Sequence, residues 1–147
     1  MPLSIRSATP TDLPALRELF LLARRATFVW QDADHFKLED FDTQTAGENV
    51  LVALDGDGDL VGFIAVWTPD RFIHHLYVDA TNQRQGVGRA LLGALPQWGV
   101  LRYALKCLTR NEAALAFYRA QGFIAVDAGV AEDGAYLLLQ SPAYVTP

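Results

Sequence analysis

Residues 72–98 read FIHHLYVDATNQRQGVGRALLGALPQW, and this stretch decides the fold. Its first part, residues 72–78, is rich in β-branched and aromatic side chains and predicts a strand. Residues 83–88 predict a loop with two glycines, and residues 89–98 predict a helix. Exposed N–H groups between a strand and a helix can hold an anion such as phosphate. The pattern therefore indicates either a phosphate cradle or an ordinary turn.

Neither common nucleotide-binding fingerprint is complete in this stretch. Leu91 stands where the dinucleotide-binding pattern needs its third glycine. No Gly-Lys-Ser or Gly-Lys-Thr follows, as an NTP-binding loop requires. A nucleotide-binding domain is therefore disfavoured, and the glycine pair alone is a weak sign of a phosphate site.

The sequence on either side of this stretch alternates between strands and helices. On the N-terminal side the expected elements are a strand (3–9), a helix that begins near Thr11 and Asp12, one or two short helices (28–47), and a hairpin (49–54 and 60–67). On the C-terminal side they are a strand (100–108), a helix (111–121), and a second hairpin (123–130 and 135–140). This order predicts an α/β (α+β) fold, with a mixed sheet and helices on its faces.

The turn of the first hairpin, residues 55–59, reads Asp-Gly-Asp-Gly-Asp and invites a calcium-binding interpretation. An EF-hand loop needs glycine at its sixth position and glutamate at its twelfth, where this chain has Leu60 and Val66. We therefore interpret the segment as a tight turn and expect no metal site.

Composition bounds the class of protein. The chain has 147 residues, is 51% hydrophobic and carries a net charge of −5, which predicts one domain over residues 1–147 and argues against nucleic acid as a partner. The single cysteine, Cys107, excludes an internal disulfide. The longest apolar run, residues 60–67, is less than half a membrane span, and the first residues lack a signal-peptide pattern. We expect a cytoplasmic protein that does not engage a membrane.

Two spaced motifs resemble the GNAT superfamily of acetyl-CoA-dependent N-acetyltransferases. The first is residues 76–79 followed by 83–92, LYVD and QRQGVGRALL; the second comprises Asn111, Ala114, residues 117–118 and residues 122–123. The likeness covers nearly the whole chain apart from residues 28–47. It implies a single GNAT-type domain whose central sheet is mixed, mostly antiparallel and flanked by helices.

The resemblance also implies a role for each motif. The backbone of Leu76, Tyr77 and Val78 would pair with the pantetheine arm of acetyl-CoA, and the Val78 N–H would face the thioester oxygen. The residues that would hold the pyrophosphate through their N–H groups are Arg84, Gln85, Gly86, Val87, Gly88 and Arg89. Asn111 would bind the pantetheine side of CoA, and Tyr118 would protonate the departing thiolate.

Structural roles compete with these assignments. Asn111 could simply cap its helix, and Tyr118 could be a core aromatic. His74 stands where many relatives carry glutamate, so it is a candidate base, although a histidine in a strand is often structural and a water chain could replace it. Strand alternation predicts that His74 shares the face of Leu76 and Val78, and that His75 points the other way.

Other side chains leave alternatives open as well. Cys107 could take the acyl group first, or could be a small buried hydrophobe. Four aromatic residues could line an acceptor pocket or cover the sheet: Trp30, Phe36, Phe41 and Trp67. The function that the resemblance implies is transfer of an acetyl group from acetyl-CoA to a primary amine of a small molecule or peptide, and it also implies that the chain could form a homodimer. The alternative is an acyl-CoA-binding module without transferase activity.

Overall fold

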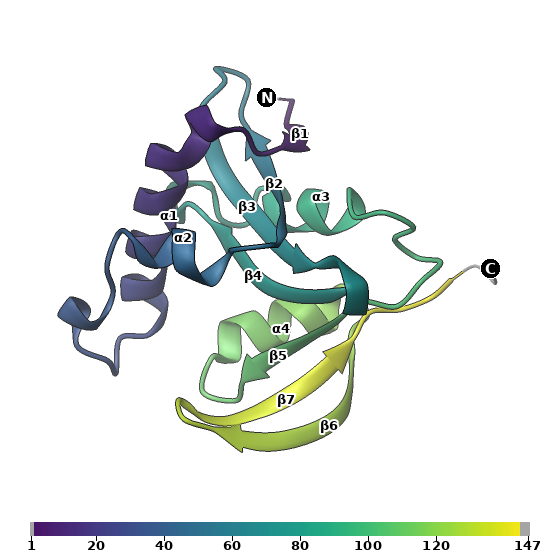
Figure 1. The fold of residues 1–147 in the computed structure, drawn as a ribbon. Helices are drawn as coiled ribbons and strands as arrows, with labels where there is room; N and C mark the ends of the chain where they lie inside the picture. The colour runs from purple at the N-terminus through teal and green to yellow at the C-terminus, as the bar shows by residue number, and fades with distance from the viewer. Residues whose placement is uncertain (1, 145–147) are drawn as a thin grey trace.

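The computed structural model describes residues 2–144 and contains one seven-stranded sheet of order β1-β2-β3-β4-β5-β7-β6 (Figure 1). The strands are β1 (Ser4–Ser7), β2 (Asn49–Leu54), β3 (Leu60–Trp67), β4 (Phe72–Val78), β5 (Ala104–Leu108), β6 (Ile124–Ala131) and β7 (Gly134–Gln140). The helices are α1 (Leu13–Thr27), α2 (Asp40–Gln44), α3 (Val87–Gly93) and α4 (Glu112–Ala120), with short 3₁₀ turns between some elements. Every strand pair is antiparallel except β4 with β5, so the expected mixed, mostly antiparallel sheet is confirmed.

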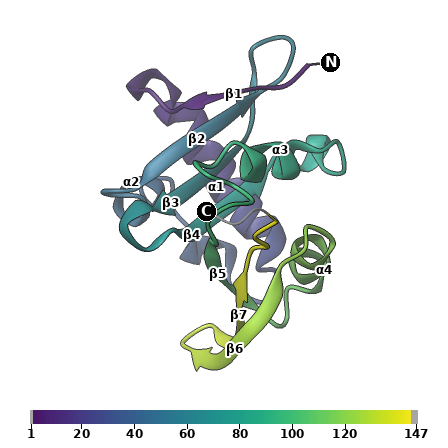
Figure 2. The same ribbon diagram turned by 90° about the vertical axis from the view of Figure 1, so that its right-hand side faces the viewer.

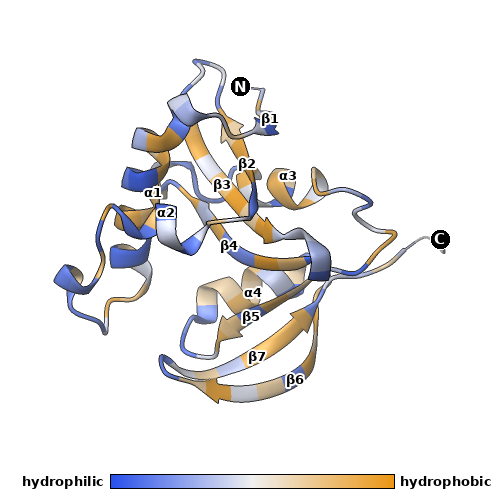
Figure 3. Ribbon diagram, in the orientation of Figure 1, coloured by the Kyte–Doolittle hydropathy of each residue, from blue (hydrophilic) through white to orange (hydrophobic). Residues whose placement is uncertain are grey.

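Helices cover both faces of the sheet. One core lies beneath α1 and α2, where Phe20 and Phe41 pack on Phe63 of β3. The other lies beneath α3 and α4, where Leu91 and Leu115 pack against sheet residues such as Ile64. Figure 2 shows α3 and α4 together on one side of the sheet, and Figure 3 shows the hydrophobic residues concentrated in the central strands.

The first helix begins at the expected place, because α1 starts at Leu13 with Asp12 as its N-cap. Thr9 is the N-cap of a 3₁₀ turn, Pro10–Asp12, that leads directly into α1, and Thr9 and Asp12 form a capping box. The Asp12 carboxylate also accepts two hydrogen bonds from Arg6 (2.7 and 3.0 Å). The predicted signal at Thr11 and Asp12 therefore marks the start of α1, and Thr9 caps the 3₁₀ turn that precedes it.

Two boundaries after β4 differ from the expected ones. Helix α3 begins at Val87, because Gly86 is its N-cap in a left-handed conformation (φ 81°), and it ends at Gly93. Residues 100–103 are not part of the next strand. Left-handed backbone at Gln97 (φ 55°) and Gly99 (φ 82°) turns the chain there, and β5 starts only at Ala104.

Both hairpins are confirmed. The turn between β2 and β3 forms around Asp55, whose Oδ1 accepts from the N–H groups of Asp57 (2.9 Å) and Asp59 (3.0 Å). Although the carboxylates of these three residues come within 4.8 Å of one another, Asp55 uses its own to fold the turn. None of the helices between residues 2 and 144 has the length and apolarity that crossing a bilayer needs.

Gly62 allows α3 to lie directly on β3. A Cβ at this position would stand 2.9 Å from Cγ1 of Val87 and 3.1 Å from the carbonyl oxygen of Tyr77. Both distances are shorter than ordinary van der Waals contact, so only glycine lets helix and strand approach this closely. This contact fixes the start of α3 beside the end of β4.

We expect Gly62→Ala to lower the free energy of unfolding by about 1–3 kcal/mol, because the added methyl overpacks a rigid part of the core. The matched control is Gly93→Ala, whose Cβ would meet nothing within 4 Å. Because alanine favours the helix over glycine, that control should stabilise the protein by about 0.5–1 kcal/mol. Urea unfolding of both variants measures the difference, and equal effects would contradict the packing argument.

Candidate functional site

Strands β4 and β5 lie side by side only at their beginnings and then part (Figure 1). These parallel strands share one register pair, Phe72 with Ala104, and the Ala104 N–H donates to the Arg71 carbonyl (3.0 Å). Beyond that pair lies a cavity of about 930 Å³, lined by the end of β4, by α1, by α4 and by the loop before α3. Paired strands satisfy each other's backbone N–H and carbonyl groups by hydrogen bonds. Because β5 is no longer beside this part of β4, the backbone groups on that edge of β4 face the cavity instead.

The Val78 N–H is one of these backbone groups. The following N–H, that of Asp79, donates to the Val61 carbonyl next to β3 (2.8 Å). Because successive residues of a strand direct their backbone groups to opposite edges, the Val78 N–H faces the gap. The Val78 carbonyl accepts from the Gln83 side chain (3.2 Å), which ties the loop to the end of the strand.

The loop before α3 is shaped by left-handed backbone. Arg84 and Gly86 have φ of 65° and 81°, and the first N–H groups of a helix have no partner within the helix itself. A Cβ at Gly86 would meet nothing within 4 Å, so glycine is favoured there by conformation rather than by space. The loop can therefore present several N–H groups to an anion.

Gly88, the second glycine of the pair, has a packing role. Its Cβ would stand 2.9 Å from Cζ of Phe117, so the absence of a side chain lets α3 approach α4. The two glycines thus act differently, one on the loop backbone and the other on the contact between two helices.

Asn111 caps α4 and also lines the cleft. Its Oδ1 accepts from the Ala114 N–H (3.2 Å), so the capping role is observed. The cap uses only the carbonyl oxygen of the amide. The amide nitrogen, a donor, takes no part in it.

Tyr118 lies on α4 at the wall of the same cleft. Its ring packs edge-on against Phe117 and Phe123, with centroids 5.3 and 5.2 Å away. Burial raises the pKa of the hydroxyl well above its usual value of 10, so the phenol keeps its proton at neutral pH. Tyr118 therefore combines a packed ring with the protonated state that an acid needs.

The expected alternation along β4 breaks at His74. Ala65 and Val66 of β3 pair with His75 and Ile73, so His74 is the extra residue of a β-bulge. Ile73 and Leu76 both pack in the core beneath α3 and α4. Because of the bulge, the two residues between them, His74 and His75, both point away from this core. The prediction that His74 shares the face of Leu76 is therefore wrong, because one inserted residue reverses the alternation.

His75 does point away from Leu76, as expected. Its ring lies against Phe20 of α1 and stacks on Tyr77, with centroids 4.9 and 6.4 Å away. Burial, and secondly the positive charge that nearby His74 can carry, lower the pKa of this imidazole to about 4. His75 is therefore a neutral packing residue.

Sequence reasoning missed Glu48, which pairs with His74. The Nδ1 of His74 forms a hydrogen bond with Oε2 of Glu48, the residue before β2. The Glu48 side chain is 3% exposed and that of His74 is 41% exposed. Burial, and secondly the cation of Lys106, lower the pKa of His74 below its ordinary value of 6.5. A single acidic residue before a strand gives no sign of this pairing, because β3 separates the two strands.

The segment between α1 and α2 reaches the other half of the sheet. The Arg110 guanidinium lies over the ring of Trp30 (4.2 Å to the centroid), and Gln31 Nε2 donates to Asp133 in the β6–β7 turn (3.4 Å). Phe36 and Phe41 are buried, and Phe41 packs on Phe63 of β3 whereas Phe36 packs against Phe28 and Arg24. Trp67, at the end of β3, is 39% exposed.

Cys107 is placed as a packing residue. It is buried in the core beneath α3 and α4. Burial raises the pKa of its thiol to about 11, which leaves the sulfur protonated at neutral pH. A protonated thiol is a poor nucleophile, so this environment does not favour a covalent acyl intermediate on Cys107.

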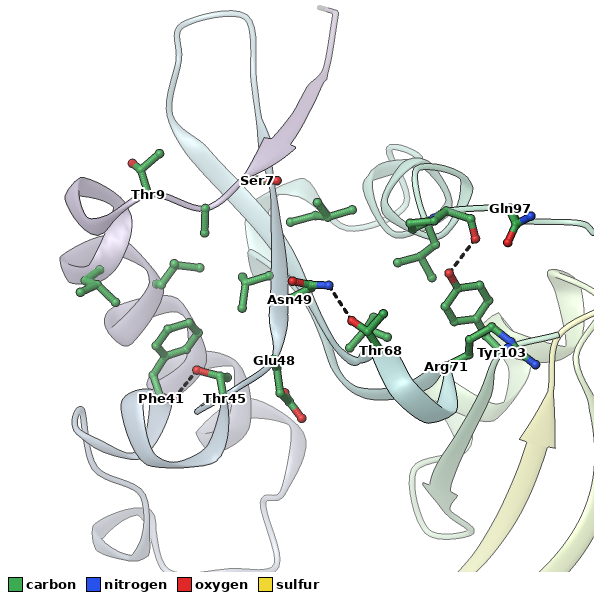
Figure 4. Close-up of a pocket in the computed structure, with 18 of the residues that line it drawn as sticks. Ser7, Thr9, Phe41, Thr45, Glu48, Asn49, Thr68, Arg71, Gln97 and Tyr103 are labelled. Carbon is green, nitrogen blue, oxygen red and sulfur yellow. Dashed lines mark hydrogen bonds between the residues drawn. The ribbon is translucent and has the colours of Figure 1, made fainter. Parts of the chain in front are cut away.

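A second cavity, of about 770 Å³, lies at the start of β2 (Figure 4). Asn49 donates there to the Thr68 hydroxyl, and Tyr103 donates to the Pro96 carbonyl (2.7 Å). Figure 4 shows Glu48 directly before Asn49, close to Thr45 at the end of α2. Glu48 thus stands between this cavity and His74.

Comparisons with known proteins agree with this geometry. The model of the acetyltransferase (GNAT) family matches residues 13–123. An aminoglycoside N(6')-acetyltransferase type 1 of Stenotrophomonas maltophilia is 34% identical over 137 residues, which cover 82% of this chain and 85% of that protein. The peptidyl-lysine N-acetyltransferase YiaC of Escherichia coli K12 is 30% identical over 128 residues, which cover 84% of each. The crystal structure of the PaiA N-acetyltransferase from Thermoplasma acidophilum in complex with coenzyme A aligns with a TM-score of 0.79 at 19% identity, covering 97% of this chain and 99% of that one.

The buried state of His75 predicts a pH dependence of stability. Its pKa of about 4 in the folded protein lies below 6.5, so between these values the unfolded chain binds more protons. Stability should therefore fall as pH drops from about 6.5 to 4, by up to about 1.4 kcal/mol per pH unit from this residue. His75→Gln should remove that contribution. Urea unfolding at several pH values compares the slopes, and identical slopes would show that His75 titrates as in the unfolded chain.

Proposed function

The chain belongs to the acetyltransferase (GNAT) family and is an N-acetyltransferase, and on this premise we propose that it transfers the acetyl group of acetyl-CoA directly to a primary amine in the cleft between β4 and β5. The amine nitrogen bonds to the thioester carbon, and the carbon–sulfur bond then breaks. The proton lost by the nitrogen balances the one that the departing thiolate takes up. The whole chain acts as one transferase domain in this proposal.

The observation that carries the proposal is the Val78 N–H, which faces the gap where β4 has lost its neighbour. A thioester oxygen placed there gains negative charge as the carbon becomes tetrahedral. A fixed backbone donor stabilises that charge more than it stabilises the ground state. By the same alternation, the backbone groups of Leu76 face this gap and would pair with the pantetheine arm, whereas those of Tyr77 face β3.

The loop from Arg84 to Arg89 would hold the pyrophosphate. Left-handed backbone at Arg84 and Gly86 directs consecutive N–H groups toward one region, and α3 adds its unpaired first N–H groups. Asn111 stands at the opposite wall of the cleft, where its amide nitrogen can donate to the pantetheine amides. The PaiA N-acetyltransferase, whose fold this chain shares, was solved in complex with coenzyme A.

Two side chains would move protons. Tyr118 is a protonated phenol at the cleft wall and would give its proton to the sulfur as the carbon–sulfur bond breaks. His74 has a lowered pKa, so its ring is mostly neutral at pH 7 and would accept the proton of the amine. His74 stands on β4 before the strands separate widely, two residues beyond the pair of Phe72 with Ala104.

Two relatives suggest the acceptor classes to test first. One is an aminoglycoside acetyltransferase and the other a peptidyl-lysine acetyltransferase, so both small molecules and peptides with primary amines are candidates. Release of free CoA thiol, measured with acetyl-CoA and each amine, tests the proposal. An amine-dependent release supports transfer, whereas binding of acetyl-CoA without release in a broad amine screen would favour the acyl-CoA-binding module.

We expect Tyr118→Phe to lower kcat by roughly a hundredfold to ten-thousandfold, because the ring packing is kept and the donated proton is lost. Acetyl-CoA affinity should hardly change, and stability should change by about 1 kcal/mol at most. The measurements are kcat, acetyl-CoA affinity and the thermal midpoint on one preparation. Normal turnover in Tyr118→Phe would remove this residue from the mechanism.

His74 predicts the shape of the pH profile. Because its neutral form is the active one and its pKa lies below 6.5, kcat/KM should be constant near neutrality and fall as the pH drops below 6.5. At a constant concentration of uncharged amine, His74→Ala should lack this fall and be slower at pH 7. A profile with the same acid limb in His74→Ala would exclude His74 as the base.

A further inference from the structure

Glu48 is the one side chain hydrogen-bonded to the proposed base within the described residues. We propose that Glu48 is a positioning residue for catalysis, whose carboxylate accepts the Nδ1–H of His74 and so leaves the Nε2 lone pair to take the proton of the acceptor amine. This inference rests on the proposed function, in which His74 is the base. It adds a second residue, from a different strand, to the proton-transfer machinery.

Burial makes this contact different from a surface ion pair. The Glu48 side chain is 3% exposed, whereas ion pairs on a protein surface contribute little because water competes for both partners. The second carboxylate oxygen, Oε1, is also buried and has no hydrogen-bond partner in residues 2–144. An unsatisfied buried oxygen is costly, and such a cost is tolerated where the group has a function. The structure therefore keeps a carboxylate here at the expense of stability.

The backbone holds both partners in fixed positions. The Glu48 N–H donates to the Thr45 carbonyl (3.0 Å), and the Thr45 hydroxyl donates to the Phe41 carbonyl (2.7 Å), so α2 anchors the residue before β2. On the other side, the β-bulge turns His74 out of the alternation of β4. Bulges re-aim side chains beside functional sites. Here the bulge gives His74 a buried partner and leaves 41% of its side chain exposed to solvent.

The tautomer is the chemical consequence. A neutral imidazole carries one proton, and an ionised carboxylate can only accept, so pairing with Glu48 fixes the proton on Nδ1. Nε2 is then the acceptor, as a base requires. When Nε2 takes a proton from the amine, the ring becomes a cation beside a carboxylate, which stabilises the protonated intermediate.

Whereas the Glu48 carboxylate favours the protonated ring of His74, another charged group disfavours it. The register of Phe72 with Ala104 places Lys106 of β5 opposite His74, and this cation disfavours a protonated ring. The ring of His75 lies 6.2 Å away and is neutral at pH 7. The Glu48 carboxylate therefore opposes Lys106 and burial, and its removal should lower the pKa of His74 further.

The test is Glu48→Gln, which keeps size and shape but removes the charge. We expect kcat to fall about 10- to 100-fold, the usual effect of losing a residue that orients a functional group, with KM for acetyl-CoA unchanged. The acid limb of kcat/KM should move to lower pH. In nitrogen NMR of the free protein, His74 should change from a single Nδ1–H tautomer to a mixture, which reports the pairing without any activity. Asp42→Asn, the same change at an exposed pair with Arg17, is the control and should alter neither.

A double-mutant cycle separates positioning from a structural role. If Glu48 acts through His74, Glu48→Gln should change kcat less than twofold in the His74→Ala background. An equal loss in both backgrounds, or an unchanged His74 tautomer, would overturn the proposal. If Glu48→Gln fails to fold, Glu48→Asp keeps the carboxylate and must preserve the Nδ1–H tautomer. Should the tautomer respond while His74→Ala retains full kcat, the base assignment itself fails, and the catalytic role of Glu48 fails with it.

Discussion

Parallel strands normally continue their pairing for several residues, but β4 and β5 meet at one pair, Phe72 with Ala104, and then separate. The groups assigned to catalysis and donor binding lie beyond this pair. Separation leaves the Val78 N–H facing a cavity instead of a strand, and it lets Tyr118 of α4 line the same space. If β4 and β5 paired along their whole length, these backbone groups would form hydrogen bonds within the sheet, and no N–H donor would remain for a thioester oxygen. In the proposed function, this interruption of the sheet is the donor site.

Three glycines determine how closely the loop from Arg84 to Arg89 approaches this gap. Gly62 lets α3 lie on β3, Gly88 lets α3 approach α4, and Gly86 supplies the left-handed turn before the helix. Three glycines with three physical reasons therefore position one loop. Two of those reasons concern packing between elements that are distant in sequence, so a pattern of glycines read as a phosphate motif describes only part of their role.

Local signals predicted most of the fold. The hairpin at residues 55–59, the helix that starts at Asn111 and the strand over residues 72–78 follow from turn chemistry, capping and β-branched side chains, and all are observed. The boundaries at Val87 and Ala104 were missed because they are set by left-handed backbone at Gly86, Gln97 and Gly99, which the periodicity of hydrophobic residues does not reveal.

The site was predictable only where a motif is contiguous. The loop around Gly86 and the pair Asn111 and Tyr118 belong to short motifs, and the structure brings them to one cleft. The orientation of His74 was not predictable, because a bulge is an insertion relative to the neighbouring strand and leaves no trace in one sequence. Glu48 was invisible for a related reason, since only the folded sheet brings residues 48 and 74 together.

The contacts of Trp30 with Arg110 and of Gln31 with Asp133 join the segment between α1 and α2 to the half of the sheet beyond β4. One is an exposed cation–π contact and the other a long exposed hydrogen bond, each worth about 1 kcal/mol or less. The free energy of unfolding of a whole domain is roughly 5–15 kcal/mol, so these two contacts can break without unfolding the protein. Residues 30 and 31 can therefore part from the other half of the sheet while Phe20 and Phe41 stay packed on Phe63.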